Sequence, residues 1–133
     1  SVDGGEVLWR DDRCRIVLAA EPEFPGFCRV IWHAHVKEMS DLDAAERARL
    51  MQVVFTTEQA LRELLSPDKI NLASLGNVTP HLHWHVIPRY RTDSRFPDPA
   101  WNPPRRESGP VTRVDTHALK TMLHGMLDSR TPA

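Results

Sequence analysis

The sequence predicts an α+β fold built from five short strands, one long helix and a second helix near the C-terminus. Three features carry this prediction: short apolar runs between turn residues, a long stretch with apolar side chains at helical spacing, and a later segment in which histidine alternates with apolar residues. At 133 residues, the chain has the usual size of one domain and can bury a core without disulfides or a structural metal. We therefore expect residues 1–133 to form a single domain.

The N-terminal part of the chain contains three predicted strands. Two apolar runs, residues 7–9 and 14–18, are separated by Asp11 and Asp12, a polar pair that suits the turn of a hairpin. Residues 27–32 are again aromatic or β-branched and follow a turn that contains proline and glycine. These local signals agree on three short strands.

Residues 43–65 are predicted to form the long helix. Asp43 and Glu46 have the spacing of a capping box at its start, and Ser66 with Pro67 marks its end. Apolar side chains, and one threonine, recur at three- and four-residue steps along it, which indicates one buried face: Leu50, Val53, Val54, Thr57, Leu61, Leu64 and Leu65.

Two further strands are predicted at residues 70–75 and 81–89. The residues between them, 76–80, begin with glycine and end with proline, and both residue types favour a turn. The predicted fold therefore contains five strands, and the last of them carries three histidines.

Residues 92–110 form a proline-rich arm in which we expect neither a helix nor a strand. Five prolines disfavour regular ladders and favour an extended path over the surface. Trp101 in this arm could cover a base, contact a partner subunit or pack against its own sheet. After the arm, Asp115 suits the cap of an amphipathic C-terminal helix at about residues 115–128.

Composition excludes several classes of function. The 17 basic and 18 acidic residues give a formal charge of −1, without the positive excess that binders of duplex nucleic acid use against phosphates. No apolar run approaches the roughly 20 residues that span a bilayer. Cys14 and Cys28 form no C-x-x-C unit, and no leader-like segment opens the sequence. We therefore expect a cytoplasmic protein without nucleic-acid or membrane partners.

The segment from His81 to Ile87 carries the strongest chemical signal. On a strand, His81, His83 and His85 would share one face while the apolar residues between them pack on the other. Neutral imidazole is a good nucleophile toward phosphorus, with neighbouring rings donating hydrogen bonds to phosphate oxygens, and it is also a good zinc ligand. The outer two rings would lie roughly 13 Å apart by strand rise, which favours the nucleophile over a shared zinc ion.

This segment resembles the His-φ-His-φ-His-φ-φ signature of the histidine triad (HIT) superfamily of nucleotidyl hydrolases and transferases, where φ is hydrophobic. Similarities at Pro25-Gly26, His35, Asn71 and Pro88-Arg89 extend the resemblance over a core of about residues 7–91. It implies a five-stranded antiparallel sheet with the long helix packed on it. It also implies a homodimer that binds a purine nucleotide, with adenine the favoured base.

The resemblance also implies roles for the three histidines. His83 is similar to the nucleophile that attacks the α-phosphate, flanked by His81 and His85. One ring nitrogen of His83 would donate to the carbonyl of His81 and leave the other lone pair facing phosphorus. Water would then hydrolyse the nucleotidyl-histidine, which requires no cofactor and no metal. The expected activity is hydrolysis or nucleotidyl transfer at a phosphoanhydride or phosphoramidate bond.

Four further residues are candidates for contacts with the nucleotide and its phosphates: Gly76, Asn77, Thr79 and His35. Asn77 corresponds to a position where the family often has a phosphate-contacting glutamine, although an asparagine there could equally adopt a left-handed turn. His35 could instead be a solvated histidine at the end of a strand.

Two departures from the family pattern keep other functions open. Val78 occupies a position where many members have a serine or threonine that touches the leaving group, and residues 32–34 lack the two basic side chains usual there. One alternative is therefore a nucleotide-binding or signalling module with little turnover. Another, from a different class, is a zinc-dependent hydrolase.

Overall fold

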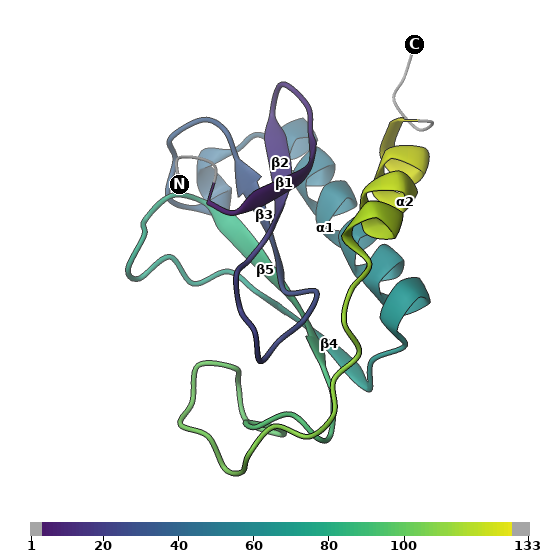
Figure 1. Cartoon of the computed structure of the whole chain (residues 1–133). Coiled ribbons are helices and arrows are strands. Elements are labelled where there is room, and N and C mark those ends of the chain that lie inside the picture. Colours follow the sequence, from purple (N-terminus) through teal and green to yellow (C-terminus); the bar gives the residue numbers. More distant parts are fainter. Residues whose placement is uncertain (1–3, 129–133) are drawn as a thin grey trace.

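The computed structural model describes residues 4–128 and contains one antiparallel sheet, with its strands in the order β1-β2-β3-β5-β4 (Figure 1). The predicted α+β fold and its five strands are confirmed. The strands are β1 (Glu6–Arg10), β2 (Cys14–Leu18), β3 (Cys28–Trp32), β4 (Lys69–Ala73) and β5 (His83–Arg89). The helices are α1 (Ala44–Leu65) and α2 (Thr116–Asp128), with a short 3₁₀ turn, η1 (Met39–Asp41), before α1.

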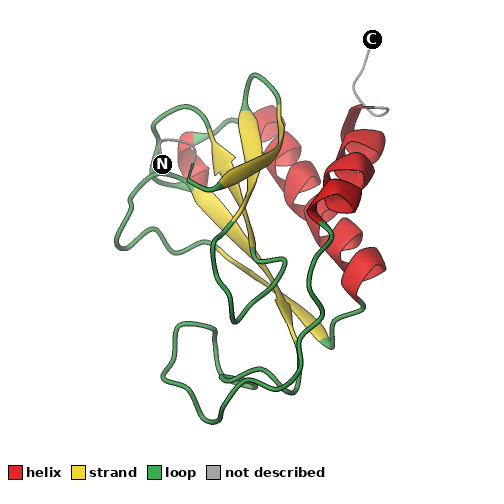
Figure 2. Ribbon diagram, viewed as in Figure 1, coloured by secondary structure: helices red, strands yellow, loops and turns green. Residues whose placement is uncertain are grey.

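Both helices lie on the same side of the sheet (Figure 2). Helix α1 contacts β3 and β5, whereas α2 contacts β1 and α1. The main core lies in this layer, where apolar side chains of the strands, among them Val30 and Val86, are fully buried against Leu50, Leu61 and Leu123 of the helices. The other face of the sheet is therefore not covered by a helix.

The ends of α1 form as the sequence predicts. The Asp43 side chain accepts a hydrogen bond of 2.8 Å from the backbone N–H of Glu46, and the Glu46 side chain accepts one of 2.9 Å from the N–H of Asp43. This reciprocal pair satisfies donors that the first turn of a helix leaves open. At the other end, Ser66 caps the helix in the left-handed region, with φ of 47°.

The last strand starts later than the alternation predicts, because the chain is bent before it. The backbone of Leu82 donates a hydrogen bond to the carbonyl of Val36 and accepts one from the N–H of Trp32. Pairing between β3 and β5 ends at Ile31 and His83. The prediction that His81 lies on the strand is therefore wrong. The preceding strand also ends early, at Ala73, and this makes the connecting loop longer than expected.

The proline-rich arm, residues 92–110, contains no helix or strand and extends beyond the sheet end of β5 (Figure 1). A buried ion pair fixes its start: Arg89 donates to both oxygens of Asp93 at 2.8 and 3.0 Å, and both side chains are 2 % exposed. Asp93 also accepts hydrogen bonds from the backbone N–H groups of Arg95 and Phe96. Burial alone would raise the pKa of Asp93, but Arg89 and these donors together hold it below its ordinary value.

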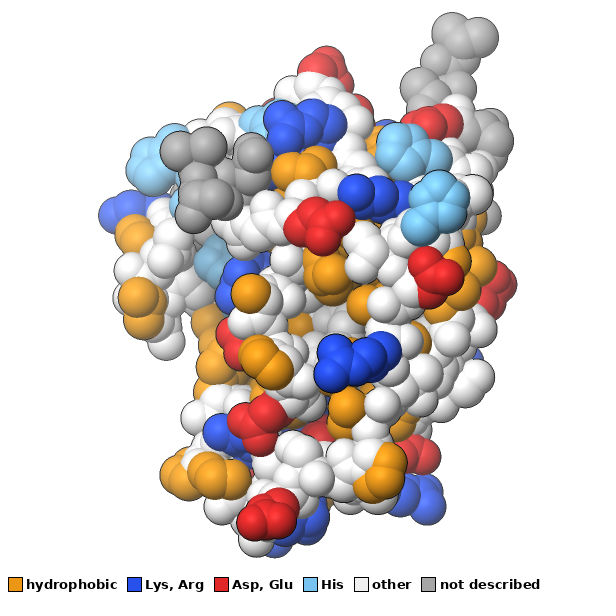
Figure 3. All heavy atoms as spheres, in the orientation of Figure 1, with side chains coloured by type: hydrophobic (Ala, Val, Ile, Leu, Met, Phe, Trp, Pro, Cys, Tyr) orange, Lys and Arg blue, Asp and Glu red, His pale blue; other side chains and the backbone are white. Residues whose placement is uncertain are grey.

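Three further properties of the described residues concern their helices, their surface charge and their thiols. No helix among residues 4–128 is long and apolar enough to cross a membrane. On the face drawn in Figure 3, acidic and basic side chains are interspersed, in keeping with the formal charge of −1. Cys14 and Cys28 are free, buried thiols, and burial raises the pKa of each to about 12.

The buried ion pair leads to a stability prediction. Arg89→Met leaves the Asp93 carboxylate buried without its cation, so the free energy of unfolding should fall by about 3 kcal/mol. Urea denaturation followed by circular dichroism measures this loss.

A surface pair in the same arm provides the matched control. Arg105 and Asp98 form an ion pair at 2.8 Å, but both residues lie near solvent, so Arg105→Met should change stability little. Equal losses in the two variants would contradict the structural role that we assign to Arg89.

Candidate functional site

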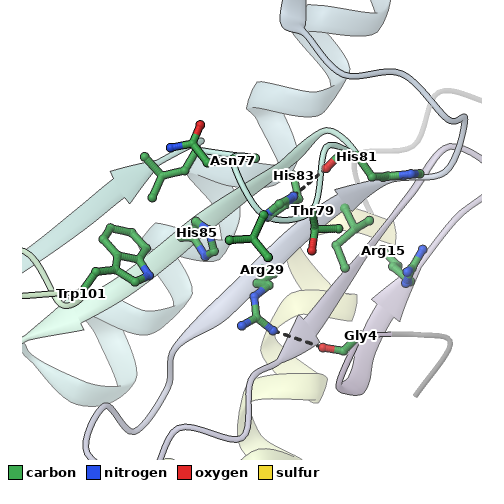
Figure 4. A pocket seen from close by; sticks show the side chains of 13 residues that line it. Gly4, Arg15, Arg29, Asn77, Thr79, His81, His83, His85 and Trp101 are labelled. Atoms are coloured by element: carbon green, nitrogen blue, oxygen red, sulfur yellow. Dashed lines mark hydrogen bonds between the residues drawn. The ribbon is translucent and has the colours of Figure 1, made fainter.

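The uncovered face of the sheet contains a cavity of about 750 Å³ (Figure 4). Side chains alternate along each strand, so residues whose neighbours pack against the helices point to this opposite face. Six of the seven residues predicted to form the site line the cavity: Gly76, Asn77, Thr79, His81, His83 and His85.

Strand register brings the histidines of β5 next to residues of β3. His83 lies directly opposite Ile31, and His85 lies directly opposite Arg29. On the far side of β3, Ile31 is paired with Arg15 of β2. The floor of the cavity is therefore formed by three adjacent strands, with His83 and His85 on one of them.

His83 has the hydrogen bond that the resemblance implies. Its Nδ1 lies 2.6 Å from the backbone carbonyl oxygen of His81, and the bond is drawn in Figure 4. A carbonyl only accepts, so Nδ1 carries the proton and donates. In the neutral ring, Nε2 then holds a lone pair without a proton, and it belongs to a side chain that lines the cavity.

His81 is held by contacts on both ring nitrogens. Its Nε2 donates to the carbonyl of Trp32 at the end of β3. Its Nδ1 lies 3.1 Å from Nδ1 of His35, so a neutral His81 accepts a hydrogen bond from His35 there. His35 itself is exposed and is not among the residues that line the cavity, so its contact with a nucleotide stays a prediction. Its ring contacts the ring of His81.

His85 is the most enclosed of the three rings, at 7 % exposed. Three aromatic rings meet it edge-on, with centroids at 4.9 Å for His83, 5.1 Å for Trp101 and 5.6 Å for Phe27. Burial, together with the nearby His83 and Arg29, lowers the pKa of His85 to about 4. The ring is therefore neutral near pH 7. Its Nδ1 has no hydrogen-bond partner within the part of the chain that the structure describes.

The loop after β4 forms one side of the cavity. Gly76 adopts a φ of +72°, a left-handed conformation that favours glycine, and Asn77 does not share it. The left-handed turn expected as an alternative role for Asn77 thus belongs to its neighbour. Asn77 and Thr79 are exposed polar residues of this loop, whereas Val78 is 95 % exposed and has no polar side-chain atom.

Sequence reasoning missed two prominent lining residues, Arg15 and Arg29, and left the role of a third, Trp101, open. The signal for the two arginines was present, because each interrupts an apolar strand at a position whose neighbours are buried. Trp101 had been expected to pack on its own sheet, cover a base or contact a partner. It contacts the sheet through His85 while remaining 49 % exposed at the cavity.

Zinc binding is the other chemistry that histidine side chains allow. Within residues 4–128, no group of three or more His, Cys, Asp or Glu side chains is arranged to hold a metal ion.

Two curated proteins are similar to this chain in sequence. An AP-4-A phosphorylase from Mycobacterium tuberculosis is 29% identical over 102 residues, which cover 72% of this chain and 52% of that protein. A bis(5'-nucleosyl)-tetraphosphatase (asymmetrical) from Schizosaccharomyces pombe is 27% identical over 95 residues, covering 68% of this chain and 52% of that protein. The chain thus spans about half the length of the curated relatives it matches.

Solved structures show the same fold. A histidine triad protein from Marinobacter aquaeolei VT8 superposes with a TM-score of 0.75 at 25% identity, covering 98% of this chain and 93% of that one. Histidine triad protein blr8122 from Bradyrhizobium japonicum gives a TM-score of 0.73 at 24% identity, covering 89% and 91% of the two chains. The model of the HIT domain family matches residues 3–92, which contain β1 to β5 and all three histidines of the site. This chain therefore belongs to the HIT domain family.

Proposed function

We propose that the protein is a nucleotide hydrolase or nucleotidyl transferase that forms a covalent nucleotidyl intermediate on His83. The observation that carries this proposal is the hydrogen bond from Nδ1 of His83 to the carbonyl of His81. It fixes the tautomer in which Nε2 is the unprotonated nitrogen, and the ring lines a cavity large enough for a nucleotide.

The reaction proceeds in two displacements. In the first, the lone pair on Nε2 of His83 forms a bond to the α-phosphorus, and the bond from phosphorus to the leaving group breaks with its electron pair on the leaving group. In the second, water attacks the same phosphorus, the N–P bond breaks back to Nε2, and one proton of the water is released. The products are a nucleoside monophosphate, the leaving group and unmodified His83.

The two flanking histidines have different roles in this proposal. His81 donates its ring N–H to Trp32, so it acts through its backbone carbonyl, which orients His83. His85 is neutral and has one ring N–H, and it is directly adjacent to His83, so it is the histidine that can donate to a phosphate oxygen. Gly76, Asn77 and Thr79 of the neighbouring loop provide further contacts to the phosphates.

The similar proteins support a nucleotide substrate. The names of both curated relatives refer to a dinucleoside tetraphosphate, so a dinucleoside polyphosphate is the first substrate to test, with a nucleoside phosphoramidate as the second. We propose a purine nucleotide with adenine as the base, a homodimer and a cytoplasmic location, as the resemblance to the family implies. Sedimentation at working concentration tests the dimer.

A second candidate function is a nucleotide-binding module with little turnover. The observation that favours it is Val78, an exposed apolar residue at a position in the loop where many family members present a hydroxyl to the leaving group.

Substitution of the nucleophile separates these two functions. His83→Ala removes the attacking nitrogen, so turnover of diadenosine tetraphosphate should fall by at least about 1,000-fold, and the covalent adduct on the protein should disappear. Release of nucleoside monophosphate and the mass of the acid-quenched protein measure the two effects.

His124→Ala is the matched control for this experiment. His124 is an exposed histidine on α2 that contacts Asp128 and does not line the cavity, so its loss should leave activity unchanged. Wild-type protein that binds nucleotide but forms neither product nor adduct would favour the binding module.

Burial of His85 predicts an acid-sensitive stability. Its pKa of about 4 in the folded protein lies below the ordinary value of 6.5, so the unfolded chain binds more protons between these two values. The part of the free energy of unfolding that depends on a neutral His85 is therefore lost as the pH falls from about 6.5 to about 4. In His85→Gln, which cannot titrate, urea denaturation over this range should show a shallower loss than in wild type. Identical pH profiles would refute the assignment.

A further inference from the structure

His85 differs from the other two histidines of the site in how its ring is held. Hydrogen bonds to backbone carbonyls fix the rings of His83 and His81, the first at His81 and the second at Trp32. In His85, by contrast, Nδ1 is buried and has no hydrogen-bond partner within the described part of the chain. Contacts with neighbouring aromatic rings therefore determine how the ring of His85 lies.

Trp101 is the ring that meets His85 from the proline-rich arm. The two ring centres lie 5.1 Å apart with their planes at 71°, and Figure 4 shows Trp101 beside His85. Phe27, which precedes β3, meets the same ring at 5.6 Å and 87°. Phe27 is buried in the core, whereas Trp101 is 49 % exposed at the cavity. The tryptophan is therefore the ring that separates His85 from water.

Hydrogen bonds within the arm hold Trp101 in place. Nε of Arg95 donates to the carbonyl of Asn102 at 3.1 Å, and Nη1 of Arg106 donates to the carbonyl of Phe96 at 2.8 Å. Each of these bonds joins a residue before Trp101 to one after it. Together they close the loop that presents the tryptophan to the sheet.

The enclosure of His85 also selects the ring nitrogen that carries its proton. The ring is neutral near pH 7 and has one N–H. A proton on the buried Nδ1 would leave an N–H donor without an acceptor, which is rare and costly in folded proteins. The proton therefore lies on Nε2. This nitrogen belongs to a ring that lines the cavity, with its centre 4.9 Å from that of His83.

We propose that Trp101 is a positioning residue which, with Phe27, holds His85 so that its Nε2–H donates to the phosphate attacked by His83. This inference rests on the proposed function. A donor that is oriented before the substrate binds needs no reorganisation during the reaction, so the contact contributes to the transition state. Trp101 lies beyond residues 3–92, which the family model matches, so this support for the site comes from the arm.

NMR of the histidine rings tests the contact without requiring turnover. In wild type, long-range ¹⁵N–¹H spectra should show the proton of His85 on Nε2. In Trp101→Ala, water reaches the ring, so its pKa should rise by at least about 1, from about 4 toward the ordinary value of 6.5. The groups that also affect this pKa, His83 and Arg29, are unchanged in the variant, and the partner of His85 on β4 is the uncharged Ala73. Trp101→Phe keeps a ring there and should retain most of the lowered pKa.

Kinetics test whether the contact serves catalysis. In Trp101→Ala, kcat for diadenosine tetraphosphate should fall about 10- to 100-fold while KM changes less than about 3-fold, because an oriented donor acts on the transition state. In a His85→Gln background the same substitution should lower kcat less than about 2-fold, because its effect passes through His85. Trp101→Phe should recover most of the lost kcat.

Phe55→Ala is the matched control. Phe55 on α1 is 50 % exposed, close to the value for Trp101, but it is not among the residues that line the cavity. Its loss should change neither the titration of His85 nor kcat.

Three outcomes would overturn the inference: an unchanged titration of His85 in Trp101→Ala, a raised KM at unchanged kcat, and equal losses of kcat with and without His85. The second would show that Trp101 contacts the ligand instead. Wild-type protein that shows the expected titration but turns over nothing would overturn the proposed attack by His83, whereas the contact of Trp101 with His85 would be confirmed.

Discussion

The bend before β5 is the constraint on which the site depends. Leu82 is hydrogen-bonded through its N–H to Val36 and through its carbonyl to Trp32, and this takes His81 out of the strand. The carbonyl of His81 then faces the ring of His83, the first residue of β5, and determines which of its nitrogens is protonated. A continuous strand would present three equivalent rings, whereas the bend lets the backbone of His81 fix the tautomer of His83.

The parts of the fold that depend on near neighbours could be predicted from the sequence. The capping box of Asp43 and Glu46 involves residues three positions apart, and it forms as expected. The alternation within β5 correctly places His83 and His85 on the cavity face and Val86 on the core face. Each of these patterns is decided by local backbone geometry, so no knowledge of the tertiary structure is needed to read it.

The parts that were missed depend on contacts between distant segments. The start of β5 is decided by hydrogen bonds from Leu82 to Trp32, the last residue of β3, and to Val36 beyond it. The alternation of apolar and polar residues contains no information about these bonds. Arg29 becomes part of the site only because strand register pairs it with His85. His35 matches a family position near the nucleotide, but it does not line the cavity and instead contacts the ring of His81, which only the tertiary structure reveals.

The arm that carries Trp101 has a consequence for how such a protein can diversify. The family match ends at residue 92, so His83 and the strands around it belong to the shared framework, whereas Trp101 lies beyond it. The arm is anchored to that framework at Arg89 and Asp93, where β5 ends. Insertions or exchanges beyond this anchor can remodel one wall of the cavity while leaving the strand ladder intact. Selection on the shape of the cavity and selection on the histidine framework can thus act on separate stretches of the same chain.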